Sequence, residues 1–228
     1  MSDAPIWISE ADVVACLDMG QAIEALEAGL AMRAAGSASV MPKTHVAWGD
    51  GDTLHAIGAV LEGEGYFGTK SWGHASGGAT PLLLLWHMAD GSLAAVIEAF
   101  ALGQLRTGGI SGLATRLLAP PDADVMALIG TGKQAEAQVA AVAATRRLAE
   151  LRVYSPTQAK REAFAERIAD HGIKTRTCAS AEEAVDGASI ITTATRARAP
   201  FLSAAMIAPS AHINAIGAIT PEREELEQ

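Results

Sequence analysis

Apolar and polar residues follow two different patterns in the first half of the chain. Ser9 precedes acidic residues and apolar positions at helical spacing, and Asp18 starts a second helical pattern from Met19 to Ala35. Short apolar runs typical of strands then follow, and Ala89-Asp90-Gly91 forms a hairpin turn between the last two. These runs are His55–Ile57, Tyr66–Lys70, Leu82–Met88 and Leu93–Ile97. The pattern predicts a mostly antiparallel sheet with helices packed on it.

A long helical stretch links this region to a second one with a different pattern. The stretch runs from Ala99 to Leu118 and stops before Pro120 and Pro121, which cannot continue a helix. Strands are then expected at Val125–Ile129, Leu151–Tyr154, Ile173–Thr177, Ser189–Thr193 and His212–Ile216. Helices are expected at Lys133–Arg147, Gln158–Ala169 and Ala181–Val185. Because strands and helices alternate with short connections, this part predicts an α/β fold with a doubly wound parallel sheet. We therefore predict an α+β domain over residues 1–119 and an α/β domain over residues 120–228.

The first strand of the second region ends in a glycine turn. Gly130-Thr131-Gly132 follows the apolar run, and an alanine-rich helical segment begins shortly afterwards. Gly130 can adopt the backbone angles of a tight turn, Gly132 lets a pyrophosphate approach the main chain, and Ala135 keeps the helix close to the sheet. The free N–H groups at the helix start would face the anion. A tight turn without a ligand is the alternative interpretation, but the alternating pattern favours a dinucleotide site.

Composition and charge narrow the classes of partner. The chain has 228 residues, 50% of them hydrophobic, which is enough for a sizeable core, and its formal net charge of -9 argues against nucleic acid or anionic membranes as partners. Cys16 and Cys178 lie far apart and the histidines lack metal-ligand spacing, so neither a disulfide scaffold nor a metal is expected. The first residues lack a basic leader, and no apolar run is long enough to span a bilayer. We expect a cytoplasmic protein.

Five short motifs occur in an order that resembles the ornithine cyclodeaminase/mu-crystallin family. They are Met41-Pro42-Lys43, Gly68-Thr69-Lys70, Leu105-Arg106-Thr107-Gly108, Gly130-Thr131-Gly132-Lys133-Gln134-Ala135 and His212–Ala218. The resemblance covers nearly the whole chain. It implies a nicotinamide-dependent protein with a substrate-binding and dimerisation domain ahead of a Rossmann domain, and hence a homodimer. Members include ornithine cyclodeaminases, alanine dehydrogenases and ketimine reductases, which exchange hydride between the nicotinamide ring and the α-carbon of an amino acid or cyclic imino acid.

The resemblance also implies the residues that handle the substrate. A carboxylate needs a cation, and Arg106 is the first candidate because a guanidinium binds carboxylates bidentately. Lys43 takes the place of the family's basic residue, usually arginine, after the Met-Pro pair. Lys70 matches the family's active-site lysine, which contacts the carboxylate and can transfer a proton if burial lowers its pKa. The alternatives are ordinary roles for these residues in capping, in a loop or on an exposed strand.

The expected cofactor is NAD or NADP. The residues expected to contact it are Thr107, Gly130, Thr131, Gly132, Gln134, Ala135, Ser155, Thr157, Thr193 and Gly217. NAD-specific domains usually carry an acidic residue at the end of the second strand, whereas this chain has Tyr154-Ser155-Pro156-Thr157 with Lys160 and Arg161 beyond. The lack of a carboxylate there favours NADP. Ser155 and Thr157 can equally be turn and N-cap residues.

Two departures from the family pattern bear on activity. Cyclodeaminases carry an aspartate shortly after the Asn-Ala-x-Gly run, and Ile219 occupies that place here. An isoleucine cannot accept a proton or pair with an ammonium, which disfavours ornithine cyclisation and favours imine reduction or another amino acid. The family's chain normally continues past the Pro-x-x-x-Glu-Leu region, so the nucleotide domain is expected to be incomplete at Gln228. A nucleotide-bound binding protein without turnover is the alternative function.

Overall fold

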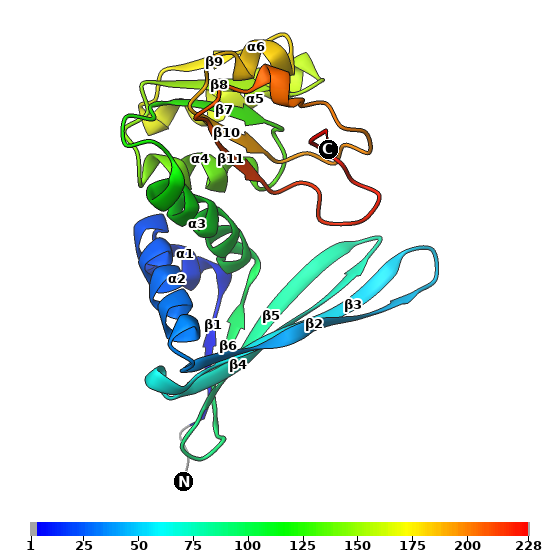
Figure 1. The fold of residues 1–228 in the computed structure, drawn as a ribbon. Coiled ribbons are helices and arrows are strands. Elements are labelled where there is room, and N and C mark those ends of the chain that lie inside the picture. Colours follow the sequence, from blue (N-terminus) through cyan, green and yellow to red (C-terminus); the bar gives the residue numbers. More distant parts are fainter. Residues whose placement is uncertain (1–3, 228) are drawn as a thin grey trace. The chain divides into compact units, whose positions relative to one another are not determined.

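The structure is a computed structural model, and it describes residues 4–227 in two compact units that divide between Arg106 and Thr107. Each unit has its own sheet (Figure 1). The helix α3, Phe100–Leu118, contains the division between the units. The boundary predicted between residues 119 and 120 lies just after α3 and stays a prediction. Within the described residues, no helix is long and apolar enough to cross a membrane.

Unit 1 contains a six-stranded sheet in the order β1-β6-β5-β4-β3-β2. The strands are β1 (Ile6–Ile8), β2 (Ala38–Trp48), β3 (Asp52–Leu61), β4 (Tyr66–Ala75), β5 (Gly78–His87) and β6 (Leu93–Glu98). Neighbours from β2 to β6 pair antiparallel, and β1 pairs parallel to β6. The predicted mostly antiparallel sheet is therefore confirmed.

The two predicted helix starts of unit 1 are also confirmed. Helix α1 (Glu10–Cys16) begins at Ser9, whose hydroxyl accepts from the Asp12 N–H while the Asp12 carboxylate accepts from the Ser9 N–H. Helix α2 (Met19–Ala34) begins at Asp18 with the same reciprocal arrangement. Such capping boxes satisfy orphan N–H groups at both helix starts.

Two strands of unit 1 have no counterpart among the predicted runs. β1 is only three residues long, and β2 is a largely exposed edge strand whose apolar residues are interrupted by polar ones. Pro42 lies within β2 at a register shift between Met41 and Thr44, and an edge strand tolerates such a residue because no neighbour needs its missing N–H. Apolar patterning detects buried strands better than exposed edges.

Unit 2 contains a five-stranded, fully parallel sheet in the order β11-β10-β7-β8-β9. The strands are β7 (Val125–Ile129), β8 (Glu150–Tyr154), β9 (Thr175–Thr177), β10 (Ile190–Thr193) and β11 (His212–Ala215). The helices are α4 (Ala135–Ala143), α5 (Gln158–Arg167) and α6 (Ala181–Val185), and short 3-10 turns lie at Glu62–Glu64 of unit 1 and at Ala169–His171 and Ala204–Met206 of unit 2. This is the predicted doubly wound, Rossmann-type sheet. Helix α4 and strand β9 are shorter than predicted.

Alternate residues of the central strand enter different cores. Met126 and Leu128 of β7 belong to a core that includes Phe164 of α5, whereas Ala127 and Ile129 belong to a second core that includes Val185 of α6. A strand buried on both faces reads as a continuous apolar run, which is why this part of the fold is visible in the sequence. The chain moves outward from β7 through β8 to β9 and then crosses to β10 on the other side of β7. The strand order thus reverses between β7 and β10, and ligands of open α/β sheets bind at such a point.

Candidate functional site

A cleft of about 840 Å³ lies in unit 2 around the carboxyl ends of its strands, within the roughly 300–1,000 Å³ typical of small-molecule and cofactor sites. Its lining comes from the turn after β7, the loop after β8, helix α5, the loop after β10 and the segment after β11. These residues are Gly130, Thr131, Gly132, Lys133, Gln134, Ser155, Pro156, Thr157, Lys160, Arg167, Ala194, Thr195, Arg196, Ile216, Gly217, Ile219 and Arg223. The cleft therefore contains the predicted glycine turn and the reversal of strand order.

The two glycines of the turn have different environments. Gly130 has a φ of +107°, and a Cβ there would lie 2.5 Å from the Ala194 carbonyl oxygen. Its N–H donates to the Tyr154 carbonyl at 2.8 Å. By contrast, a Cβ on Gly132 would meet no protein atom within 4 Å. Gly130 is thus required by the fold, whereas Gly132 borders open space that a ligand can use.

The first turn of α4 faces the cleft with its N–H groups uncapped by a side chain. Gln134 occupies the N-cap position without a side-chain bond to the helix, while Ala135 is fully buried. Within the described residues, the Gln134 side-chain oxygen is buried and accepts no hydrogen bond. The Ala135 N–H donates to the Gly132 carbonyl at 3.0 Å. The positive end of the helix dipole and the unobstructed main chain at Gly132 fit a pyrophosphate group, and the Gln134 oxygen can accept from a ligand donor.

The side chains around the cleft are strongly cationic. Five of them are Lys133, Lys160, Arg167, Arg196 and Arg223. No aspartate or glutamate is among the described residues that line it. This local excess of positive charge contrasts with the net charge of -9 for the whole chain. The cleft therefore suits an anion with several charges.

Seven of the ten predicted cofactor residues line this cleft. They are Gly130, Thr131, Gly132, Gln134, Ser155, Thr157 and Gly217. Three lie outside the lining: Ala135 is buried beneath the turn, the Thr107 carbonyl accepts from the Gln138 side chain at 3.3 Å, and the buried Thr193 hydroxyl donates to Glu225 at 2.9 Å. Contacts of these residues with a cofactor stay predictions.

Glu225, the glutamate of the Pro-x-x-x-Glu-Leu region, is a buried residue to which the sequence analysis assigned no role. Its carboxylate accepts hydrogen bonds from groups beside the cleft, and only 1% of the residue is exposed. Glu225 follows three other charged residues, and this local pattern does not distinguish a buried carboxylate from a solvated one. Only the tertiary structure reveals its position.

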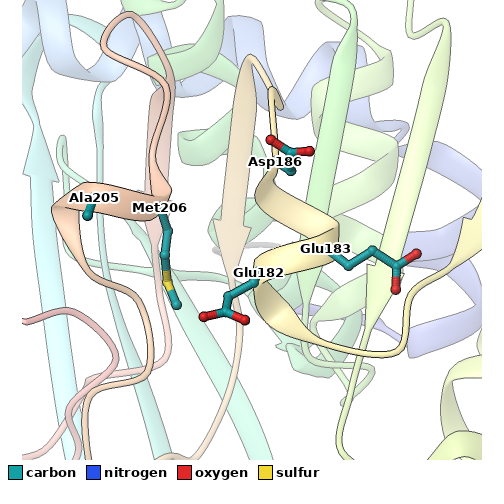
Figure 2. A pocket seen from close by; sticks show the side chains of 5 residues that line it. All are labelled: Glu182, Glu183, Asp186, Ala205 and Met206. Carbon is teal, nitrogen blue, oxygen red and sulfur yellow. The ribbon is translucent and has the colours of Figure 1, made fainter.

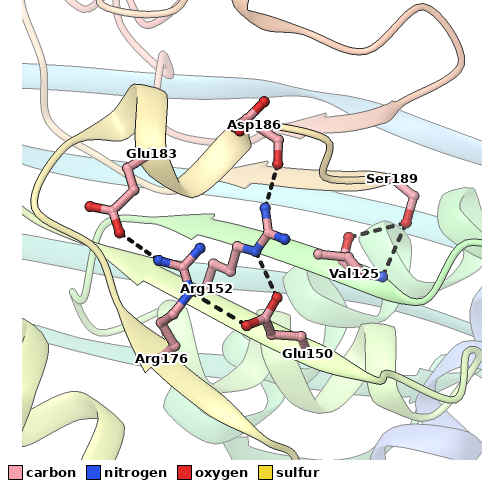
Figure 3. Close-up of polar contacts among 7 residues, drawn as sticks. All are labelled: Val125, Glu150, Arg152, Arg176, Glu183, Asp186 and Ser189. Atoms are coloured by element: carbon pink, nitrogen blue, oxygen red, sulfur yellow. Dashed lines mark hydrogen bonds and ion pairs between the residues drawn. The ribbon is translucent and has the colours of Figure 1, made fainter.

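A smaller hollow of about 360 Å³ beside α6 has the opposite charge (Figure 2). Glu182, Glu183 and Asp186 line it together with Ala205 and Met206. Glu183 points away from Met206 and instead forms an ion pair with Arg176 (Figures 2 and 3). An acidic rim repels phosphates, so this hollow is unsuitable for a dinucleotide.

Unit 1 holds a separate cluster of cations, in which Lys43 and Lys70 lie over the Trp72 ring and the charge of Arg106 acts on Lys70. Lys70 lies mid-sheet on β4, paired with Ile57 and Leu83 on the adjacent strands. The Lys70 ammonium lies 4.5 Å from the Trp72 ring centroid, and the Lys43 ammonium lies 5.6 Å from the same centroid. We refer to Lys43, Lys70 and Arg106 as the cation cluster.

The cation cluster changes the protonation of its central member. Burial lowers the pKa of Lys70 from the ordinary lysine value of 10.5, and the charges of Arg106 and Lys43 lower it further. Desolvation also lowers the pKa of the Arg106 guanidinium. The residue is nevertheless exposed to solvent, and a guanidinium stays protonated at physiological pH. A bound carboxylate would relieve the mutual repulsion of these charges. The three predicted substrate residues thus lie together in a setting suited to an anion.

Trp72 and His55 are further members of this region that sequence analysis did not single out. The His55 ring stacks on Trp72 at 4.8 Å and on His45 at 5.5 Å between centroids. Burial and the charges of Lys43, His45 and His74 lower the pKa of His55, which keeps it neutral at neutral pH. Side chains two apart on a strand share a face, so the spacing from Lys70 to Trp72 is a signal that could have identified the tryptophan.

The amino ends of the strands in unit 2 carry polar contacts of a different kind (Figure 3). The Ser189 hydroxyl accepts from the N–H groups of Asp124 and Val125, each at 3.1 Å. Glu150 pairs with Arg152 and Arg176 across β8 and β9. These contacts tie strands together at the edge opposite the cleft.

Comparison with known proteins agrees with the sequence motifs. The model of the "Ornithine cyclodeaminase/mu-crystallin family" matches residues 5–228. Ketimine reductase mu-crystallin of Mus musculus is 37% identical over 145 residues, covering 64% of this chain and 45% of that protein. The chain thus spans about half the length of this curated relative.

Two solved structures share the fold over most of this chain. An archaeal alanine dehydrogenase dimer with bound NAD has a TM-score of 0.91 at 29% identity, covering 98% of this chain and 70% of that one. The Δ1-pyrroline-2-carboxylate reductase of Thermococcus litoralis, in complex with NADH and L-proline, has a TM-score of 0.91 at 27% identity, covering 97% of this chain and 72% of that one. The chain belongs to the ornithine cyclodeaminase/mu-crystallin family.

Proposed function

We propose that this protein is an NAD(P)-dependent oxidoreductase that exchanges hydride with the α-carbon of an amino acid or cyclic imino acid. The observation that carries the proposal is the cationic cleft at the glycine turn, where Gly132 leaves the main chain open to a ligand. Relatives named as a ketimine reductase, an alanine dehydrogenase and a pyrroline-2-carboxylate reductase support this class of reaction. The nicotinamide ring, when bound, supplies or accepts the hydride.

The protein's own residues divide the remaining tasks between the two units. In unit 2, the backbone at Gly130–Gly132 and the first turn of α4 would hold the pyrophosphate. In unit 1, Arg106 would bind the substrate carboxylate bidentately, with Lys43 as a second cation. Lys70 would contact the carboxylate and transfer a proton, since its lowered pKa makes the ammonium a better proton donor than that of an ordinary lysine.

We propose NADP as the preferred cofactor. The adenine ribose of a dinucleotide lies beyond the second strand of such a sheet, where Ser155, Thr157 and Lys160 line the cleft. The described lining contains no carboxylate to repel a 2′-phosphate.

Lys160→Ala should weaken NADPH binding about tenfold and leave NADH binding nearly unchanged, since only NADPH carries the extra phosphate. The exposed Lys174 lies outside the cleft, so Lys174→Ala is the matched control. Equal losses for both cofactors in Lys160→Ala would contradict the preference.

A binding assay and a turnover assay together test the proposed function. Fluorescence titration with NADH and NADPH measures dinucleotide binding, and cofactor oxidation with cyclic imino acids or with pyruvate plus ammonia measures turnover. The proposal expects saturable binding and oxidation with at least one substrate of this panel. Absence of binding would refute it.

Binding without oxidation would instead favour the alternative, a nucleotide-bound binding protein without turnover. Ile219 is the observation that favours this alternative, because it lines the cleft and is 74% exposed at the place where cyclodeaminases carry an aspartate. The same residue disfavours ornithine cyclisation. Retention of Lys70 and Arg106 favours turnover.

We further propose a homodimer in the cytoplasm. Large apolar side chains, including Val46 of β2 and its cross-strand partner Leu54 of β3, are exposed on the sheet of unit 1, and such surfaces mark interfaces. One structural relative is described as a dimer. The free thiols of Cys16 and Cys178 suit a reducing compartment. Light scattering after size exclusion measures the oligomeric state, and a monomer at micromolar concentration would contradict the dimer.

A further inference from the structure

The carboxylate of Glu225 is buried beside the cleft and accepts four hydrogen bonds. Its Oε1 accepts from the Thr195 N–H at 2.8 Å and from the Thr195 hydroxyl at 2.6 Å. Its Oε2 accepts from the Thr193 hydroxyl and the Gly217 N–H, each at 2.9 Å. Each of these four donors is neutral, and a carboxylate offers enough acceptor positions for all of them. Burying a charge on neutral donors is costly unless the geometry is complete.

The four donors belong to segments that form one wall of the cleft. Thr193 ends β10, Thr195 follows it, and Gly217 follows β11, so Glu225 joins the carboxyl ends of two neighbouring strands. Thr195 and Gly217 themselves line the cleft. A Cβ on Gly217 would lie 2.3 Å from Glu225 Oε1, so the backbone fits closely around the carboxylate.

The same segment supports the glycine turn. The Ala194 N–H donates to the Ile129 carbonyl at 2.8 Å, and the Ala194 carbonyl occupies the space that a side chain on Gly130 would need. A displacement of Thr195 would therefore move Ala194 and disturb the turn that faces the ligand. Glu225 is thereby connected through Thr195 and Ala194 to the glycine turn that lines the cleft.

We propose that Glu225 is a positioning residue for the dinucleotide site. It fixes the loop after β10 and the turn after β11 so that their backbone is already in place before the ligand binds. Preorganised walls lower the free-energy cost of binding. The inference rests on the proposed function, because it assumes that the cleft binds a dinucleotide. It assigns Glu225 no contact with the ligand.

Glu225→Gln is the direct test. The amide keeps the shape but presents an NH2 group to donors, so at least one backbone N–H loses its acceptor and the wall must shift. We expect the NADPH dissociation constant to rise about tenfold or more. It should be measured at a temperature where circular dichroism shows the variant fully folded. In steady-state assays, the KM for the dinucleotide should rise while the KM for the imino acid stays unchanged.

Ser189→Ala is the matched control for stability. It also removes hydrogen bonds between strands of this sheet, but these are partly buried or exposed and lie at the amino ends of β7 and β10 (Figure 3). It should lower the urea midpoint of unfolding without changing the NADPH dissociation constant. A purely structural role for Glu225 would give Glu225→Gln the same behaviour.

Thr193→Val provides a milder variant if Glu225→Gln does not fold. It removes one donor to Glu225 with little change of shape, and Thr193 is fully buried. We expect several-fold weaker NADPH binding in the folded variant. Unchanged NADPH binding in folded Glu225→Gln would overturn the inference, and so would unchanged binding in Thr193→Val if Glu225→Gln does not fold. In either case, NADPH binding by the wild type would still support the proposed function. Absence of binding in the wild type would overturn both.

Discussion

The cation cluster of unit 1 and the cleft of unit 2 both suit anions, but they are built in different ways. In the cluster, burial and the charges of Arg106 and Lys43 lower the pKa of Lys70. In the cleft, the main chain of the glycine turn lines the space, and five cations are distributed over the lining. We therefore expect a single side chain to decide substrate binding in the cation cluster, whereas backbone geometry should decide dinucleotide binding in the cleft.

Arg106→Ala should have the largest effect. Removing the guanidinium deprives the substrate carboxylate of its bidentate partner, so we expect kcat/KM for the imino acid to fall by about 30-fold or more, corresponding to roughly 2 kcal/mol or more. Steady-state kinetics measure this loss. Arg106→Lys should recover part of it, because the charge remains but the planar fork is lost. The affinity for NADPH should be unchanged, and a parallel loss of both would show that Arg106 has another role.

The two glycines of the turn form a matched pair with opposite expected results. Gly130→Ala should destabilise the fold by about 1–3 kcal/mol from backbone strain alone, since φ is +107° and the Cβ would approach the Ala194 carbonyl to 2.5 Å. Gly132→Ala should leave stability nearly unchanged and weaken NADPH binding about tenfold, because its methyl group enters only the open space. Urea unfolding and fluorescence titration measure the two effects. Normal NADPH affinity in Gly132→Ala would contradict a main-chain phosphate site.

Lys43→Gln should have the smallest effect, which is a shift in the pH dependence of kcat/KM. When Lys70 loses its proton, it no longer binds the carboxylate as a cation, so kcat/KM should fall on the alkaline side at a pH below the ordinary lysine value of 10.5. Removing the Lys43 charge raises the pKa of Lys70 and should move this alkaline limb to higher pH. An unmoved limb would show that another group produces it.

The lowered pKa of Lys70 also makes the free energy of unfolding depend on pH. Between the lowered pKa of Lys70 and 10.5, the unfolded chain holds a proton that the folded chain has released. The free energy of unfolding contributed by Lys70 therefore rises with pH across that window. Lys43→Gln should narrow the window, and urea unfolding at several pH values would detect the change.

The sequence predicted the parts of the fold whose physical signals are local. The central strand β7 of unit 2 is buried on both faces and appears as an apolar run, and the first two helices have caps within three residues of their starts. The edge strand β2 was missed because its residues are largely exposed. The glycine turn and the three cations were identifiable as motifs. The burial of Glu225 and the stacking of His55 on Trp72 depend on contacts between segments far apart in the sequence, which no local pattern encodes.

Amide hydrogen exchange with and without NADPH would show where on the chain the dinucleotide binds. We expect slower exchange on binding in peptides covering Gly130 to Ala137, Ser155 to Lys160 and Ala194 to Arg196, all at the carboxyl ends of the strands. Peptides around Ser189, at the amino ends, should exchange at an unchanged rate. NADPH binding that leaves the Gly130 peptide unprotected would contradict the account.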